Sequence, residues 1–181
     1  PFLTGNAAAR TGAGLTSLLG PPGLERMTDS RERDLIFPFT REEVLFGERT
    51  DRIDEFLERQ NAFVLGPGLG QSEELSDAVM DFLRNHEQPI VLDADGLNNV
   101  RDNPGDLSDC DNLILTPHPG EASRLLGRPI DDVLADPVQA LEDLVSLTGQ
   151  TIVLKTSRPI VGYPGGGLSV NVTGTAALAK G

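Results

Sequence analysis

The sequence predicts a layered α/β fold in which helices pack on a mostly parallel sheet. Three observations lead to this prediction: short apolar segments recur after residue 61, helical patterns separate them, and the chain after residue 158 reads as two strands joined by a glycine-rich turn. The apolar segments do not alternate with polar residues, which is typical of parallel strands buried on both faces. They are Ala62-Phe63-Val64-Leu65, Pro89-Ile90-Val91-Leu92, Leu113-Ile114-Leu115 and Thr151-Ile152-Val153-Leu154.

Two helices are predicted between these strands. Residues 73–85 carry their apolar side chains at helical spacing. Residues 137–148 form the clearest helical pattern, because Asp136 is a suitable N-cap, Pro137 fits the first helical position and Gly149 can end the helix. Alternating strands and helices imply right-handed crossovers between neighbouring parallel strands.

The N-terminal third of the chain differs in composition. Residues 1–24 are rich in glycine and alanine, and residues 25–59 carry dense, mixed charge with a helical pattern over residues 51–59. We expect residues 25–59 to form a solvated surface segment without a catalytic or binding role. The 181 residues suit one domain, and the start at Pro1 and stop at Gly181 suggest a single incomplete domain over residues 1–181.

Composition excludes several classes of function. Lysine and arginine number 15 against 28 aspartates and glutamates, giving a net charge of −13 that argues against nucleic acid or an anionic membrane as partner. The single cysteine, Cys110, excludes an internal disulfide and a zinc cluster, so a reducing, cytoplasmic location is expected. No apolar run approaches the roughly 20 residues of a membrane helix.

Open α/β sheets bind ligands at the carboxyl ends of their strands, so the residues that follow each strand are candidates. The first strand is followed by Gly66-Pro67-Gly68-Leu69-Gly70, which either lets the backbone approach an anion or forms an ordinary tight turn. The second is followed by Asp93 and Asp95, two carboxylates that require a ligand, a cation or a capping role at the end of a buried strand.

The third strand is followed by His118, which two flanking prolines hold in an extended segment, and by Glu121 in the first turn of a helix. The other histidine, His86, follows a helix in a polar stretch and is expected at the surface. The fourth strand is followed by Lys155, one of two lysines in an arginine-rich chain. This lysine either directs a compact charge at phosphate or extends from the strand end into solvent.

The ordered set of motifs is more specific than its members. GPGLG, DADGLN, TPHPGE, VLK and Asn171-Val172-Thr173-Gly174 with its small-residue tail together resemble the ADP/ATP-dependent NAD(P)H-hydrate dehydratase family. The resemblance covers residues 62–181 well, and the opening TGNAAARTGAGL also looks like the first Gly/Ala-rich helix of that family. It implies a ribokinase-like three-layer sandwich, with a mostly parallel central sheet and helices on both faces.

The resemblance also implies a reaction. A nucleotide, ADP or ATP, would drive removal of the 6-hydroxyl from hydrated NADH or NADPH, and ADP as donor would yield AMP and phosphate. Mg²⁺ is expected to accompany the nucleotide, and no metal ligand set is assigned to the chain. A homo-oligomer is expected, because members of this family are commonly oligomeric.

The resemblance assigns candidate site residues. Gly68 and His118 match positions that contact the hydrated dinucleotide, and Asp95 and Asn98 are expected to line the same cleft. The segment Lys155-Thr156-Ser157-Arg158-Pro159 matches the part that binds nucleotide phosphate.

Some candidate positions depart from the pattern or are less specific. Thr156 stands where the family usually has glycine, and Pro159 has no N–H to donate. Asp93 is expected at the same cleft, and Glu121 is expected to orient metal or water.

The catalytic base of the family is an aspartate in a Gly-Asp stretch, and the resemblance places this stretch beyond Gly181. The catalytic residue is therefore unknown in this chain. The fragment alone is expected to be inactive, because it lacks this base. The first strand of the fold is expected ahead of Pro1.

Two alternative functions stay open: a ribokinase-like kinase of the thiazole or pyrimidine type, and a non-catalytic nucleotide-binding module. The TPHPGE segment favours the dehydratase over the kinase.

Overall fold

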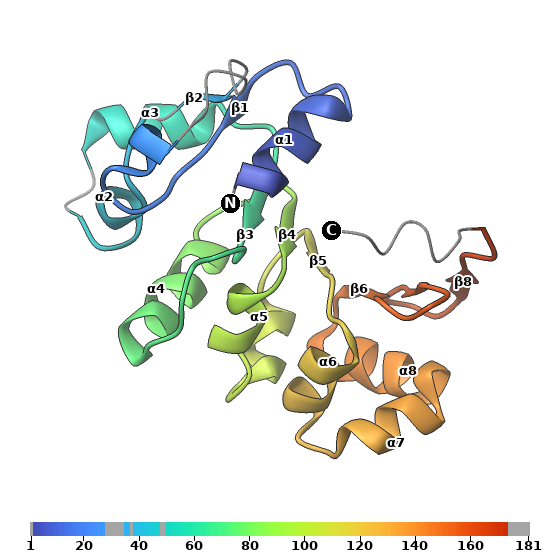
Figure 1. The fold of residues 1–181 in the computed structure, drawn as a ribbon. Helices are drawn as coiled ribbons and strands as arrows, with labels where there is room; N and C mark the ends of the chain where they lie inside the picture. The colour runs from blue at the N-terminus through green and yellow to red at the C-terminus, as the bar shows by residue number, and fades with distance from the viewer. Residues whose placement is uncertain (1, 28–34, 37, 48–49, 174–181) are drawn as a thin grey trace. The chain divides into compact units, whose positions relative to one another are not determined.

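A computed structural model describes residues 2–27, 35–36, 38–47 and 50–173. Its contacts divide the chain into two compact units, each described here by itself (Figure 1). The first comprises Pro1–Gln60 with Pro67–Leu69, and the second comprises Asn61–Gly66 with Gly70–Gly181. None of the described helices has the length and apolar composition needed to cross a membrane.

The first unit contains short helices and a two-stranded parallel sheet. Its elements are α1 (Phe2–Arg10), β1 (Thr16–Ser17), the 3₁₀ helix Leu24–Met27, β2 (Leu35–Ile36), α2 (Arg41–Leu45) and α3 (Asp51–Glu58). Thr40 and Glu43 form a capping box at the start of α2, and Thr50 caps α3. The charged segment therefore contains two capped helices, of which the sequence predicted only the second.

The second unit is built on a six-stranded sheet whose strand order follows the sequence (Figure 1). The first four strands are parallel, and the last two form an antiparallel hairpin. The strands are β3 (Phe63–Leu65), β4 (Ile90–Leu92), β5 (Leu113–Leu115), β6 (Thr151–Leu154), β7 (Ile160–Gly162) and β8 (Leu168–Val170). All four predicted parallel strands and the predicted hairpin are confirmed.

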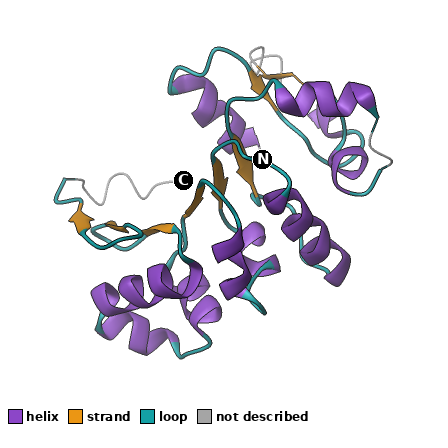
Figure 2. Cartoon of the chain, turned by 180° about the vertical axis from the view of Figure 1, so that it is seen from behind, coloured by secondary structure: helices purple, strands orange, loops and turns teal. Residues whose placement is uncertain are grey.

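Helices connect these strands, as Figure 2 shows in purple. They are α4 (Glu73–Arg84), α5 (Asp95–Asn99), the 3₁₀ helix Pro104–Asp109, α6 (Pro119–Leu126), α7 (Ile130–Ala135) and α8 (Pro137–Thr148). The Asp136 side chain accepts the Gln139 N–H at 3.0 Å, and Gly149 ends α8 at a φ of 69°. Both predicted helices are confirmed, and the caps of α8 lie where the sequence places them.

The central strands β4, β5 and β6 are fully buried on one face of the sheet. Ile90, Leu92 and Ile152 have no exposed surface on this face. Helix α4 packs against it through the edge-to-face contact of Phe82 with Phe63. On the other face the described strand residues are only partly buried, and half of the Val64 surface is exposed. The expectation of strands fully buried on both faces is therefore wrong for the described residues.

His86 is part of the core, and its prediction as a surface residue is wrong. Only 7% of its surface is exposed. Its ring stacks on Phe82 at a centroid distance of 4.0 Å and meets Phe63 edge-on. Its Nδ1 lies 2.7 Å from the Phe82 carbonyl oxygen, so this nitrogen carries the proton and donates it. The polar neighbours in the sequence gave no sign of these ring contacts.

The single cysteine is expected to react slowly with thiol reagents. Cys110 is buried, and this burial raises the pKa of its thiol, so that little thiolate forms at neutral pH. We expect a thiol-reactive disulfide reagent to label the folded protein at least about tenfold more slowly than the denatured protein. Equal rates in the presence and absence of denaturant would contradict this burial.

Candidate functional site

The residues that follow β4, β5 and β6 meet at the carboxyl edge of the sheet (Figure 1). Backbone hydrogen bonds continue from the strands into these loops. The Asp93 N–H donates to the Leu65 carbonyl at 3.0 Å, and the Thr116 N–H donates to the Leu92 carbonyl at 3.1 Å. The Lys155 N–H donates to the Pro117 carbonyl at 2.8 Å. These bonds fix the loop backbones on which the candidate side chains stand.

Lys155 lies between two carboxylates at this edge. Its Nζ is 2.5 Å from Oδ1 of Asp93 and 3.8 Å from Oε2 of Glu121. Glu121 is buried, with 5% of its surface exposed, whereas Lys155 and Asp93 are accessible to solvent. Asp93, Glu121 and Lys155 form what we call the strand-end cluster. In it two carboxylates face one ammonium, so the cluster has an excess of one negative charge.

His118 is the N-cap of α6. Its Nδ1 accepts the N–H groups of Gly120 and Glu121 at 3.0 and 3.4 Å, and its own N–H donates to Oε2 of Glu121 at 2.8 Å. Because Nδ1 is an acceptor, the neutral ring carries its proton on Nε2, which lies 3.4 Å from Oε1 of Glu121. Half of the His118 side chain is exposed, so the capped ring is still accessible to a ligand.

Asp93 and Asp95 diverge, although they are two residues apart. Between them Ala94 has a φ of 51° and a ψ of −120°, a strained backbone conformation that turns the chain from β4 directly into α5. Asp95 accepts the Gly70 N–H at 2.9 Å and the Gln71 Nε2 at 3.1 Å. Asp95 therefore holds the end of the glycine loop, while Asp93 pairs with Lys155.

Two polar residues near the site have roles that the sequence did not predict. Asn99 is buried and donates from Nδ2 to the carbonyl oxygens of Gly70 and Asp95, both at 2.8 Å. Arg124 on α6 donates from Nε to Oδ1 of Asn98 at 2.8 Å. The only sequence signal for Arg124 was its place one helical turn after the TPHPGE motif.

The segment 155–159 is mostly exposed. Within it, the Thr156 hydroxyl donates to the Arg158 carbonyl at 2.6 Å, and Ser157 is exposed. The Pro159 carbonyl accepts the Asn171 N–H at 2.9 Å.

Gly68 belongs to the first unit, within Pro67–Leu69, and has a φ of 71°. Its relation to the strand-end cluster stays a prediction. The small-residue tail over residues 174–181 lies outside the described residues.

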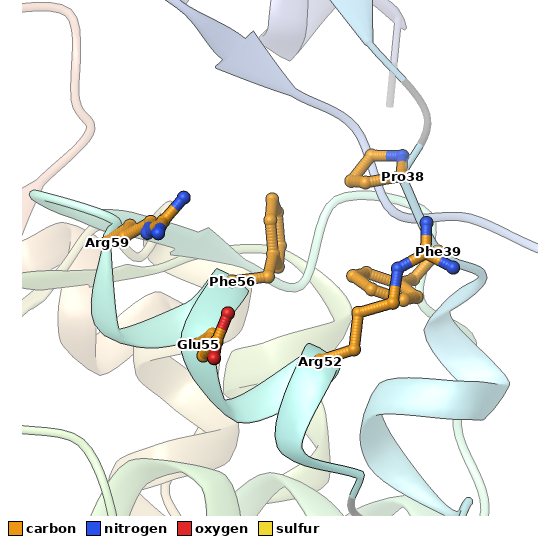
Figure 3. A pocket seen from close by; sticks show the side chains of 6 residues that line it. All are labelled: Pro38, Phe39, Arg52, Glu55, Phe56 and Arg59. Carbon is orange, nitrogen blue, oxygen red and sulfur yellow. The ribbon is translucent and has the colours of Figure 1, made fainter.

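A cavity of about 230 Å³ lies in the first unit, away from these candidates in the sequence. Figure 3 shows the residues that line it: Pro38, Phe39, Arg52, Glu55, Phe56 and Arg59. The Arg52 guanidinium lies 5.3 Å from the centre of the Phe39 ring, which itself meets Phe56 edge-on. None of the residues predicted for the site lines this cavity.

The described residues offer no group of three or more His, Cys, Asp or Glu side chains that could hold a metal ion. Asp93 and Glu121 are two carboxylates close to one another, and Lys155 lies between them. A divalent ion often takes only one or two protein carboxylates when it is bound to nucleotide phosphates. This pair could supply one or two carboxylate ligands to a divalent ion that is also bound by a phosphate ligand.

Comparison with protein families and curated relatives agrees with the motif order. The family model described as NAD(P)H-hydrate dehydratase matches residues 1–181. The protein named ADP-dependent (S)-NAD(P)H-hydrate dehydratase from Neisseria meningitidis is 39% identical over 135 residues, covering 71% of this chain and 46% of the relative. The bifunctional NAD(P)H-hydrate repair enzyme Nnr of Escherichia coli is 34% identical over 181 residues, covering 99% of this chain and 32% of the relative. The chain thus spans less than half of the length of these relatives.

Solved structures agree on the fold. A ribokinase-like superfamily protein from Enterococcus faecalis superposes with a TM-score of 0.80 at 22% identity, covering 99% of this chain and 60% of that one. A Bacillus subtilis ADP/ATP-dependent NAD(P)H-hydrate dehydratase, co-crystallised with ATP/Mg²⁺ and soaked with CoA, gives a TM-score of 0.80 at 25% identity, covering 99% of this chain and 63% of that one. The predicted ribokinase-like α/β fold is confirmed. With the family model matching over its full length, the chain belongs to the NAD(P)H-hydrate dehydratase family.

Proposed function

We propose that this chain provides the ligand-binding edge of an ADP-dependent NAD(P)H-hydrate dehydratase, a lyase that repairs hydrated nicotinamide nucleotides. The observation that carries the proposal is the TPHPGE segment at the carboxyl end of β5. There, buried Glu121 holds the backbone of His118 and faces Lys155 across the edge. The family model and the names of the relatives support this assignment.

The reaction has a simple chemical logic. Hydroxide is a poor leaving group, so the 6-hydroxyl oxygen of the hydrated ring first accepts a phosphoryl group from ADP and loses its proton, releasing AMP. The C–O bond then breaks, phosphate leaves with the bonding electrons, and the neighbouring carbon loses a proton to restore the double bond. The protein must hold the two reactants in contact and exclude water from the transferred group.

The candidate residues divide between the two ligands. Gly68, His118, Asp95 and Asn98 are the candidates for contact with the hydrated dinucleotide. The segment Lys155-Thr156-Ser157-Arg158-Pro159 contacts the nucleotide phosphates through side chains and through the N–H groups of Ser157 and Arg158. The N–H groups of Lys155 and Thr156 already donate to backbone carbonyls, and Pro159 has none. Mg²⁺ bound to the nucleotide would neutralise phosphate charge, and Asp93 and Glu121 are the carboxylates placed to face it.

The preference for ADP follows the names of the relatives, and the choice between hydrated NADH and NADPH is not assigned to any residue. A homo-oligomer, expected from the resemblance, and a cytoplasmic location, expected from the single cysteine, are part of the same proposal.

The proposal is tested by incubating hydrated NADH and ADP with a longer protein that carries this sequence and matches the length of its relatives, because residues 1–181 alone are expected to be inactive. We expect the absorbance of the reduced nicotinamide ring to return, with one AMP and one phosphate formed for each ring restored. Accumulation of a stable phosphorylated alcohol would instead identify a kinase. Binding of ADP without any product would identify a non-catalytic nucleotide-binding module.

A further inference from the structure

The strand-end cluster cannot attract an anion through Lys155 alone. Its ammonium is already paired with Asp93 at 2.5 Å and lies 3.8 Å from Glu121. An anionic ligand that approached this edge would meet more negative than positive charge, in a chain whose net charge is −13. Both ligands of the proposed reaction carry phosphates, so the edge needs a positive charge that no carboxylate compensates.

Arg124 provides such a charge. Most arginines that the structure describes in the second unit have a carboxylate partner, as in the pairs Arg84–Asp106 at 3.3 Å and Arg128–Asp143 at 2.6 Å. Among the described residues, no carboxylate lies within ion-pair distance of Arg124. Among the described residues, its side-chain partner is the neutral oxygen Oδ1 of Asn98, which orients the guanidinium and leaves its charge uncompensated.

The guanidinium of Arg124 lies on the same side of α6 as the His118 ring. A methyl group placed on Gly120 would be 2.9 Å from Cε1 of His118 and 3.7 Å from Nη1 of Arg124. Both side chains therefore border the space in front of Gly120. The backbone N–H groups of Gly120 and Glu121 are taken by Nδ1 of His118 and are not free for an anion. A side-chain cation is thus the available donor there.

We propose that Arg124, oriented by Asn98, binds a phosphate group of a ligand at the carboxyl edge of the sheet. Nε is engaged by Asn98, and the two terminal nitrogens retain the planar pair of donors that suits a phosphate. The phosphate comes either from the nucleotide donor or from the hydrated dinucleotide. The choice of these ligands rests on the proposed function, whereas the phosphate-binding role rests on the charges and distances alone.

The test compares Arg124→Met with Arg84→Met by calorimetric titration of the protein with ADP and, separately, with hydrated NADH. Arg84 is an exposed arginine in the last turn of α4, so its replacement removes the same charge elsewhere. We expect Arg124→Met to raise the Kd of one ligand about tenfold or more, and Arg84→Met to change both less than about twofold. The ligand that is affected identifies the source of the phosphate. Equal Kd values for wild type and Arg124→Met with both ligands would overturn the proposal.

A second variant distinguishes a phosphate-binding role of Arg124 from a purely structural role of its contact with Asn98. Asn98→Asp places a carboxylate 2.8 Å from Nε of Arg124 and keeps, or strengthens, the link between α5 and α6. If Arg124 binds phosphate, this variant should raise the same Kd about tenfold while the melting temperature is unchanged or higher. If the link only stabilises the fold, the Kd should equal that of wild type, and this result would also overturn the proposal.

Inorganic pyrophosphate distinguishes failure of the inference from failure of the proposed function. If wild type binds neither ADP nor hydrated NADH, the proposed function is wrong. Pyrophosphate binding that weakens about tenfold in Arg124→Met would still support the phosphate site in that case. Pyrophosphate binding that is absent, or unaffected by the substitution, would then reject the site as well.

Discussion

Replacing Gly66 by alanine is expected to prevent the second unit from folding stably. Gly66 has a φ of 122°, and a Cβ atom there would lie 1.8 Å from the Asp93 carbonyl oxygen and 2.6 Å from the Gly96 nitrogen. Both atoms belong to the backbone, so no side-chain rotation can relieve the clash. We expect a loss of about 4 kcal/mol or more in the free energy of unfolding, a large part of the stability of a typical domain. Urea denaturation followed by circular dichroism measures it.

Gly70→Ala is the matched control, in the same loop. Gly70 also has a positive φ, of 86°, but the nearest atom to an added Cβ is Cδ1 of Leu75 at 3.9 Å. Gly70→Ala therefore introduces backbone strain without a clash, and we expect it to lower the free energy of unfolding by about 1–2 kcal/mol. If Gly66→Ala were as stable as Gly70→Ala, the close approach of the two backbones at the ends of β3 and β4 would be wrong.

The largest expected effect on activity comes from Lys155→Met. This substitution leaves Asp93 and Glu121 at the edge without the cation between them, so an incoming phosphate meets two uncompensated carboxylates. We expect the turnover of hydrated NADH with ADP to fall at least about a hundredfold, as it does when other enzymes lose one electrostatic contact to a transferred group. Steady-state kinetics of the longer protein that carries this sequence measures this effect, with Arg84→Met as the control for loss of a surface charge.

A double-mutant cycle identifies the cause. Asp93→Asn removes one of the two carboxylates, so its combination with Lys155→Met should cost less than the two single effects added together. Additive effects, or a turnover of Lys155→Met within a few-fold of wild type, would show that the ion pair has no part in the reaction.

The sequence predicted the strands of the sheet well. Unalternating apolar runs marked the parallel strands, and an N-cap, a proline and a glycine marked the ends of α8. Such signals are local, so they can be read from neighbouring residues. The extent of burial was not predictable in the same way, because it depends on which segments pack on each face of the sheet.

The side-chain partners at the edge were less predictable. Asp93 and Asp95 would share one face of a regular strand, but the positive φ of Ala94 sends them to different partners, and alanine gives no sign of such a conformation. The roles of Arg124 and Asn98 depend on each other across 26 positions of the chain. Contacts of this kind arise from the tertiary fold and have no local pattern.

The strand order of the sheet has a consequence for biosynthesis. Each strand pairs with the one made just before it, from β3 through β8, so no strand must be inserted between two that have already paired. The sheet can therefore lengthen one strand at a time as the polypeptide leaves the ribosome. The hairpin of β7 and β8, made after the four parallel strands, would then add to a sheet in which those strands are already assembled.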